Sequence, residues 1–99
     1  MARPPAAKST FRDRFPRRNS ASVRALSRNV LRLRRARRWN QAELADAAGI
    51  EQGAVSLIES GRANPTLLVL DQIAKALGVA TVELLDARRG ERARRTPAV

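Results

Sequence analysis

The chain has no cysteine and no histidine among its 99 residues, and only 3% of them are aromatic. Without cysteine there is no disulfide framework and no thiolate to bind a metal or act as a nucleophile. Without histidine the chain lacks the commonest general base and metal ligand. The nine acidic residues include no pair at a spacing typical of a catalytic dyad. We therefore expect a protein that is not an enzyme and that needs no cofactor.

Long apolar runs are also missing. None approaches the ~20 residues that a membrane-spanning helix requires, so we expect a soluble protein with no membrane partner. Residues 1–40 are rich in arginine and poor in acids, a composition that is also found in organelle transit peptides. The basic run continues, however, into a predicted helix whose apolar residues the core needs. We therefore favour one small cytoplasmic domain with tails.

Positive charge is absent from one stretch of an otherwise basic chain. The net charge is +11, yet residues 41–61 contain four acids and no lysine or arginine. Residues 1–40 carry a net charge of +12, residues 41–87 carry −5 and residues 88–99 carry +4. An acidic body between cationic segments favours a polyanionic partner, with nucleic acid ahead of an anionic membrane surface.

Composition divides the chain into a domain and two tails. Residues 1–21 contain three prolines and no helical period, so we predict a disordered basic N-terminal arm. Residues 88–99 also lack an apolar period and are predicted to be a flexible basic C-terminal tail. Between them, residues 22–87 are predicted to form a compact all-α domain. Its five helices are expected over residues 22–37, 41–48, 52–60, 67–77 and 81–87.

The second and third predicted helices, joined by a tight glycine turn, have the steric signature of a helix-turn-helix. Asn40 and Glu43 form a capping box, and Gly49 suits the left-handed turn that ends a helix. Counted from Gln41, a small residue is required at position 5, glycine at position 9, and inward apolar residues at positions 4, 8, 10, 15 and 18. These positions hold Ala45, Gly49, Leu44, Ala48, Ile50, Val55 and Ile58. Because each position constrains the residue type independently, the pattern favours this motif over an ordinary helical bundle.

Three segments carry a resemblance to a known family. The stretches "LRLRRARRWNQAELADAAGI", "VSLIESGRANP" and "LDQIAKALGV" resemble the phage repressor and Cro type of helix-turn-helix regulators, the XRE-like family. The resemblance covers about residues 26–86. It implies a five-helix lambda-repressor-like domain that binds double-stranded DNA as a transcriptional regulator.

The resemblance also implies which residues read bases. In such regulators the N-terminal, outward residues of the second motif helix meet base edges in the major groove. On this chain those residues are Gln52, Gly53, Ser56 and Leu57. Gln52 is the strongest candidate, because a glutamine amide can bond adenine N6 and N7 together. The absence of arginine from this helix predicts contacts biased toward adenine and thymine.

Further roles follow from the same resemblance. Contacts to the DNA backbone are implied for Asn40, Gln41, Arg62 and Asn64, and an ion pair is implied between Arg34 and Glu59. Two positions depart from the family pattern. Arg38 stands where glycine is usual, which leaves open whether the turn after the first helix is the same. Trp39 stands where leucine is usual, and we expect it to anchor the core.

Our first interpretation is a sequence-specific repressor, associated with the nucleoid, that binds a two-fold symmetric operator as a homodimer. Val79, Val82 and Leu85 are expected at the dimer contact. Three alternatives stay open. The chain can be an antitoxin that represses its own operon while an arginine-rich tail binds a toxin. It can also be a restriction–modification controller protein, or a general chromatin or RNA binder that acts through its tails.

Overall fold

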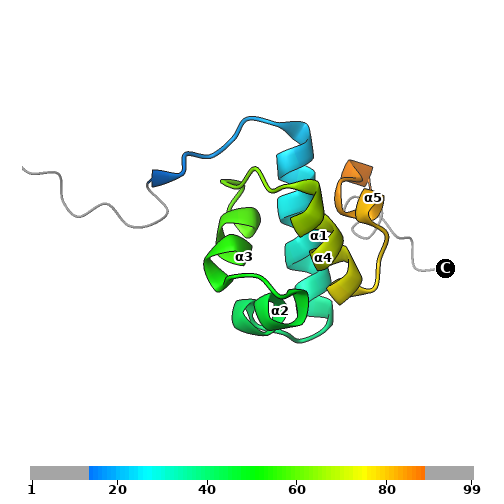
Figure 1. Ribbon diagram of the computed structural model, residues 1–99. Helices are drawn as coiled ribbons and strands as arrows, with labels where there is room; N and C mark the ends of the chain where they lie inside the picture. Colours follow the sequence, from blue (N-terminus) through cyan, green and yellow to red (C-terminus); the bar gives the residue numbers. More distant parts are fainter. Residues whose placement is uncertain (1–13, 89–99) are drawn as a thin grey trace, which may run out of the picture.

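Five helices follow one another along residues 14–88, the part of the chain that the computed structural model describes (Figure 1). They are α1 (Ala21–Ala36), α2 (Gln41–Ala48), α3 (Gln52–Glu59), α4 (Leu67–Leu77) and α5 (Thr81–Leu84). This described part contains no strand, and the predicted all-α fold is confirmed. None of its helices is long and apolar enough to cross a membrane. The remaining residues, 1–13 and 89–99, hold most of the two predicted tails and lie outside the described residues.

Helix α1 begins at Ala21 because the Ser20 hydroxyl caps it by accepting a hydrogen bond from the Val23 amide at 3.3 Å. Both ends of α1 therefore lie one residue earlier than we predicted. The turn after α1 places Arg38 at a φ of 58°, in the left-handed region. Glycine adopts this conformation freely, whereas a residue with a side chain loses about 1 kcal/mol there. The turn thus keeps its left-handed residue although arginine replaces the usual glycine.

The tight turn between α2 and α3 forms as predicted. Helix α2 starts with a complete capping box, in which Asn40 Oδ1 accepts from the Glu43 amide at 2.8 Å and Glu43 Oε1 accepts from the Asn40 amide at 3.0 Å. Gly49 ends α2 with a φ of 69°, and α3 starts three residues later. Helix α3 ends at Glu59, one residue before the predicted end, and Ser60 is its C-cap.

The core lies where α1, α2, α3 and α4 meet, and α5 closes one end of it. The apolar residues that the motif requires face inward: Leu44, Ala45, Ala48, Val55 and Ile58 are buried, and Ile50 packs partly buried against them. Trp39 is also partly buried against this core, which confirms its predicted role as an anchor. The same packing sets the angle between α2 and α3, because the two helices pack on each other while α3 also rests on α1 and α2 on α4.

Helix α5 is shorter than predicted, and Leu84 is its buried residue. It spans Thr81–Leu84, whereas we expected a helix over residues 81–87. Leu84 is fully buried, but Val82 is 75% exposed and Leu85 is 37% exposed. Since Leu84 alone of these three side chains enters the core, α5 turns the other two outward.

A buried asparagine of α1 holds this end of the chain. Asn29 is 1% exposed, and its Nδ2 donates to the carbonyls of Glu83, Leu84 and Asp86 at 3.2, 2.9 and 3.0 Å. The chain leaves the helix at Leu84, where Asn29 takes over the bonding of these carbonyls. Buried backbone carbonyls need a hydrogen-bond donor. The Asn29 side chain therefore supplies the hydrogen bonds that the N–H groups of a longer helix would otherwise have supplied.

The segment before α1 is attached to the loop between α3 and α4. The Arg18 amide donates to the Gly61 carbonyl at 2.9 Å, and Arg62 Nη1 donates to the Phe15 carbonyl at 3.1 Å. We expected residues 1–21 to form a disordered arm. Within that arm the structure describes residues 14–21, and these two hydrogen bonds join them to the folded domain.

Substitution of Asn29 by alanine should destabilise the protein, because the carbonyls at the end of α5 would lose their donor. An unsatisfied buried polar group costs about 1–3 kcal/mol, which lowers the melting temperature by at least about 4 °C in a domain of this size. Asn19→Ala is the matched control, since the exposed Asn19 only accepts a hydrogen bond from the exposed Arg24. Thermal unfolding followed by circular dichroism measures both variants, and equal melting temperatures would contradict the role given to Asn29.

Candidate nucleic-acid interface

The first turns of α3 present the residues that we expected to read bases. Gln52 is the first residue of α3 and is exposed, and Gly53, Ser56 and Leu57 are half-buried. Residues four apart lie on the same face of a helix, so Gln52 is aligned with Ser56 and Gly53 with Leu57. The core-facing side of α3 is occupied by other residues, which leaves this face as the outer surface of the motif.

Leu57 lies at the edge of a hollow that also contains two of the expected backbone contacts. This hollow has a volume of about 390 Å³, and its lining includes Leu57, Arg62, Asn64 and Phe15. Arg62 is half-buried and its guanidinium holds the Phe15 carbonyl, whereas Asn64 is exposed. The structure thus places Leu57, Arg62 and Asn64 around one hollow beside the segment that precedes α1. Gln52 lies at the start of α3, at a distance from this hollow.

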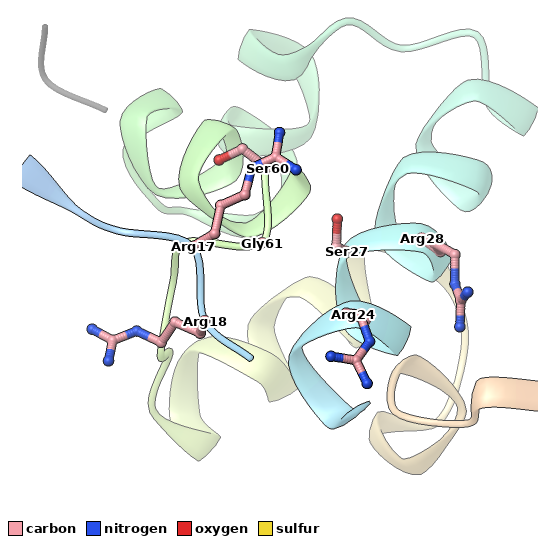
Figure 2. Close-up of a pocket in the computed structure, with 7 residues that line it drawn as sticks. All are labelled: Arg17, Arg18, Arg24, Ser27, Arg28, Ser60 and Gly61. Atoms are coloured by element: carbon pink, nitrogen blue, oxygen red, sulfur yellow. The ribbon is translucent and has the colours of Figure 1, made fainter. Parts of the chain in front are cut away.

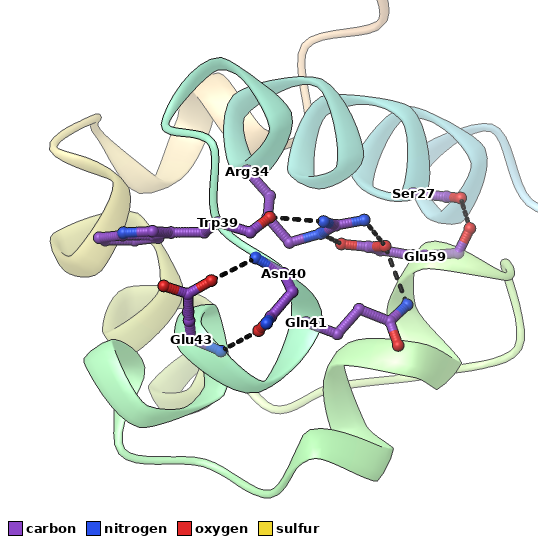
Figure 3. A network of polar contacts seen from close by, with 7 residues as sticks. All are labelled: Ser27, Arg34, Trp39, Asn40, Gln41, Glu43 and Glu59. Atoms are coloured by element: carbon purple, nitrogen blue, oxygen red, sulfur yellow. Dashed lines mark hydrogen bonds and ion pairs between the residues drawn. The ribbon is translucent and has the colours of Figure 1, made fainter.

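A network of polar contacts joins α1, α2 and α3 (Figure 3). Arg34 Nε donates to Glu59 Oε2 at 2.6 Å and Arg34 Nη2 donates to Glu59 Oε1 at 2.9 Å. The ion pair that the resemblance implied is therefore present in the structure, with two parallel bonds. The two side chains are only 12% and 6% exposed. Such fork-to-fork pairing fixes geometry as well as charge.

The network extends to the start of α2 and to the turn before it. Arg34 Nη1 donates to the Trp39 carbonyl at 2.7 Å, and Gln41 Nε2 donates to Glu59 Oε1 at 3.1 Å. On the other side, the Ser27 hydroxyl donates to the Glu59 carbonyl at 2.6 Å. Glu59 is thus held through both its carboxylate and its main chain, so the last residue of α3 is tied to α1 and α2 at once.

The charge of Arg34 is well matched to this site. Its hydrogen bond to the Glu59 carboxylate raises the pKa of Arg34 above its usual value, although burial acts in the opposite direction. The guanidinium therefore stays charged, and it stabilises the Glu59 carboxylate in a place that excludes most of the solvent.

Several residues of the interface region were not identified from the sequence. Asn29 stands at a position of α1 three residues after Leu26, inside the buried stripe, and a polar residue there is a signal that its side chain has a partner. Ser20 before α1 was a readable cap signal. The contacts of Ser27 and Phe15 carry no such signal, because their partners are backbone carbonyls or side chains more than 30 residues away.

Comparison with known proteins agrees with this geometry. A family model described as helix-turn-helix matches residues 30–84, which is more than half of the chain. The chain belongs to the XRE-like helix-turn-helix family. As a member of this family, it is a DNA-binding transcriptional regulator.

Two relatives of this XRE-like regulator illustrate the match. An uncharacterized HTH-type transcriptional regulator, y4dJ, of Sinorhizobium fredii (strain NBRC 101917 / NGR234) is 44% identical over 57 residues, which cover 58% of this chain and 74% of that protein. A crystal structure of NHTF, a hypothetical transcription factor from Neisseria, superposes with a TM-score of 0.68 at 32% identity and covers 81% of this chain and 90% of that one.

Substitution of Arg34 by alanine should destabilise this XRE-like regulator strongly. The change would leave the buried Glu59 carboxylate with Gln41 as its side-chain donor, and an uncompensated buried charge costs roughly 3–5 kcal/mol. Arg35→Ala removes the same charge from the adjacent, exposed position and should change stability little. Urea unfolding of both variants makes the comparison. If the midpoint of Arg34→Ala matched that of Arg35→Ala, the ion pair would not contribute to stability.

Proposed function

We propose that this protein is a sequence-specific repressor that reads the major groove of an operator with the outer face of α3. The observation that carries the proposal is the position of Gln52, exposed at the first residue of a helix whose last residue is tied to α1 and α2. A reading helix must be held at a fixed angle, because its side chains have to meet particular base edges. The Arg34–Glu59 pair provides that constraint.

The residues around Gln52 determine the kind of sequence that we expect the protein to prefer. A glutamine amide matches the N6 and N7 groups of adenine, and Leu57 offers an apolar surface for a thymine methyl. No lysine or arginine lies between Gln41 and Gly61, so the usual bidentate partner of guanine is absent from α3. We therefore propose half-sites whose contacted positions are mainly adenine and thymine.

Contacts to the DNA backbone are proposed for Asn40, Gln41, Arg62 and Asn64. Gln41 donates one N–H to Glu59 and has a second N–H on the same amide nitrogen, which is suited to a phosphate oxygen. The amides of the first turn of α2 add a partial positive charge beside it. Arg62 and Asn64 flank α3 on the other side, next to the hollow that contains Leu57. Phosphate contacts on both sides of the reading helix would fix its register on the duplex.

We further propose that the protein acts as a homodimer on a two-fold symmetric site, with α5 at the interface. Val82 within α5 is 75% exposed, and Leu85, the C-cap of α5, is 37% exposed. Val79, which we also expected at the dimer contact, is partly buried against the core of its own chain. The exposed pair is therefore the better candidate for contact with a second copy.

Gln52→Ala should relax sequence discrimination without changing stability, because the side chain is exposed and a bidentate base contact is worth roughly 1–3 kcal/mol. Selection of bound sequences from randomised duplex DNA measures specificity, site symmetry and half-site spacing for the wild type and the variant. Gln72→Ala, which truncates an exposed glutamine of α4, is the matched control. The same selected motif from wild type and Gln52→Ala would refute base reading by Gln52, and no enriched motif from the wild type would refute the proposed function itself.

Val82→Lys should shift the protein from dimer toward monomer, since burying an unpaired charge at an apolar contact is unfavourable. Ala47→Lys introduces the same charge at an exposed position of α2 and should leave the assembly unchanged. Sedimentation velocity across a concentration series measures the dissociation constants of wild type and variants. Identical constants for all three proteins would exclude Val82 from the interface.

A further inference from the structure

Four arginines contribute to the lining of one hollow at the end of α3 opposite to Gln52 (Figure 2). The hollow has a volume of about 260 Å³. It lies between the N-terminal segment, the first half of α1 and the residues that follow α3. Its lining includes Arg17 and Arg18 from the segment, Arg24 and Arg28 from α1, and Ser60 and Gly61 after α3. We call this hollow the arginine pocket.

The arginine pocket has no negative side chain of its own. No carboxylate lines it, and the first turn of α1 contains no acid. Among residues 14–88, the ion pair joins Arg34 to Glu59, and none of the four pocket arginines takes part in one. Arg24 donates to the neutral Asn19 side chain at 3.0 Å. Like charges four residues apart on a helix, such as Arg24 and Arg28, repel each other, and this repulsion persists until an anion is present.

The main chain holds the two halves of the pocket in place. The Arg18 amide donates to the Gly61 carbonyl at 2.9 Å, and Arg62 Nη1 donates to the Phe15 carbonyl at 3.1 Å. These bonds set the segment with Arg17 and Arg18 opposite α1. Two parts of the chain that are separate in the fold therefore line one hollow with arginines. Figure 2 shows their exposed guanidinium groups pointing in different directions, so a bound anion would have to draw them together.

We propose that the arginine pocket binds a phosphate group. Guanidinium groups present planar sets of N–H donors that match phosphate oxygens, and four exposed arginines along one hollow supply positive charge for an anion with more than one negative charge. The serine hydroxyl hydrogens are already used, because Ser27 donates to the Glu59 carbonyl and Ser60 to the Leu57 carbonyl. The arginines are therefore the donors.

The phosphate can come from two sources. One is the DNA backbone beyond the bases that α3 contacts, a source that rests on the proposed function. Ser60 follows Gln52 by eight residues, about 12 Å along the helix axis, so this contact would be separate from base reading. The other source is a free phosphorylated small molecule. Both sources would place a phosphate group in the pocket. Only the first source makes the pocket part of the contact with DNA.

The first experiment uses inorganic pyrophosphate as the probe and thermal unfolding of the full chain as the readout, at ionic strength held constant with sodium chloride. Millimolar pyrophosphate should raise the melting temperature of the wild type by about 5 °C or more, since a ligand that binds only the folded state stabilises it. The variant Arg24→Gln/Arg28→Gln should lose most of this shift. The control Arg35→Gln/Lys75→Gln removes two exposed charges elsewhere and should keep it.

A second pocket variant protects the test against misfolding. Arg17→Gln/Arg18→Gln changes only the exposed segment before α1, whose Arg18 main-chain bond remains possible, and it should also lose the shift. The proposal is wrong if pyrophosphate shifts the wild type and both pocket variants equally, or if it shifts none of them.

The second experiment separates the two sources by the salt dependence of binding to a long duplex. Each phosphate contact contributes about 0.9 to the slope of log affinity against log salt. If the pocket holds a backbone phosphate, the pocket variants should lose about one unit of slope more than the control. If it holds a free phosphorylated molecule, variants and control should share one slope while the pyrophosphate result persists. Failure of the wild type to bind any duplex would refute the proposed function and leave the pyrophosphate experiment interpretable.

Discussion

One ion pair, Arg34 with Glu59, ties the end of α3 to α1. Glu59 is the last residue of α3, and Arg34 reaches it from α1 with two parallel hydrogen bonds while a third bond holds the Trp39 carbonyl. Gln41 adds a bond from the first residue of α2. The pair is almost completely shielded from water, so its partners depend strongly on each other. Because a helix of eight residues is not stable in isolation, the angle at which α3 is presented depends on its packing against α1 and α2 together with this tether.

The charge distribution along the chain separates two tasks. Residues 41–61 contain no lysine or arginine, and they form α2, the turn and α3. Arginines instead lie on α1, in the segment before it and in the loop after α3, where Arg62 holds the Phe15 carbonyl. Phosphate contacts contribute affinity without sequence information, whereas base contacts discriminate. A helix α3 without lysine or arginine, next to cationic elements, suits a protein in which these two contributions come from different elements, as we propose, and the arginine pocket places part of that charge at one defined point.

The N-terminal segment links these two features. Its backbone bonds with Gly61 and Arg62 attach it to the loop just after α3, beside the residues that we propose for phosphate contact. Arg62 was expected from the family pattern to face DNA, and the structure shows that its guanidinium also organises this segment. Arg62 thus connects the loop after α3 to the segment before α1, and this segment contributes to the lining of both the arginine pocket and the hollow beside Leu57.

Much of this fold was predictable because its signals are local. The capping box of Asn40 with Glu43 and the left-handed Gly49 depend on neighbouring residues, and the inward positions of α2 and α3 follow from helical periodicity. The pairing of Arg34 with Glu59 was available through family resemblance. What the sequence did not reveal depends on contacts between distant residues. Asn29 bonds carbonyls more than 50 residues away, and this contact ends α5 early and makes Leu84 the buried residue. Backbone carbonyls have no residue-specific signature, so only the tertiary structure could show that Asn29 and Arg62 bond to them, and only packing could bring four arginines from two segments around one pocket.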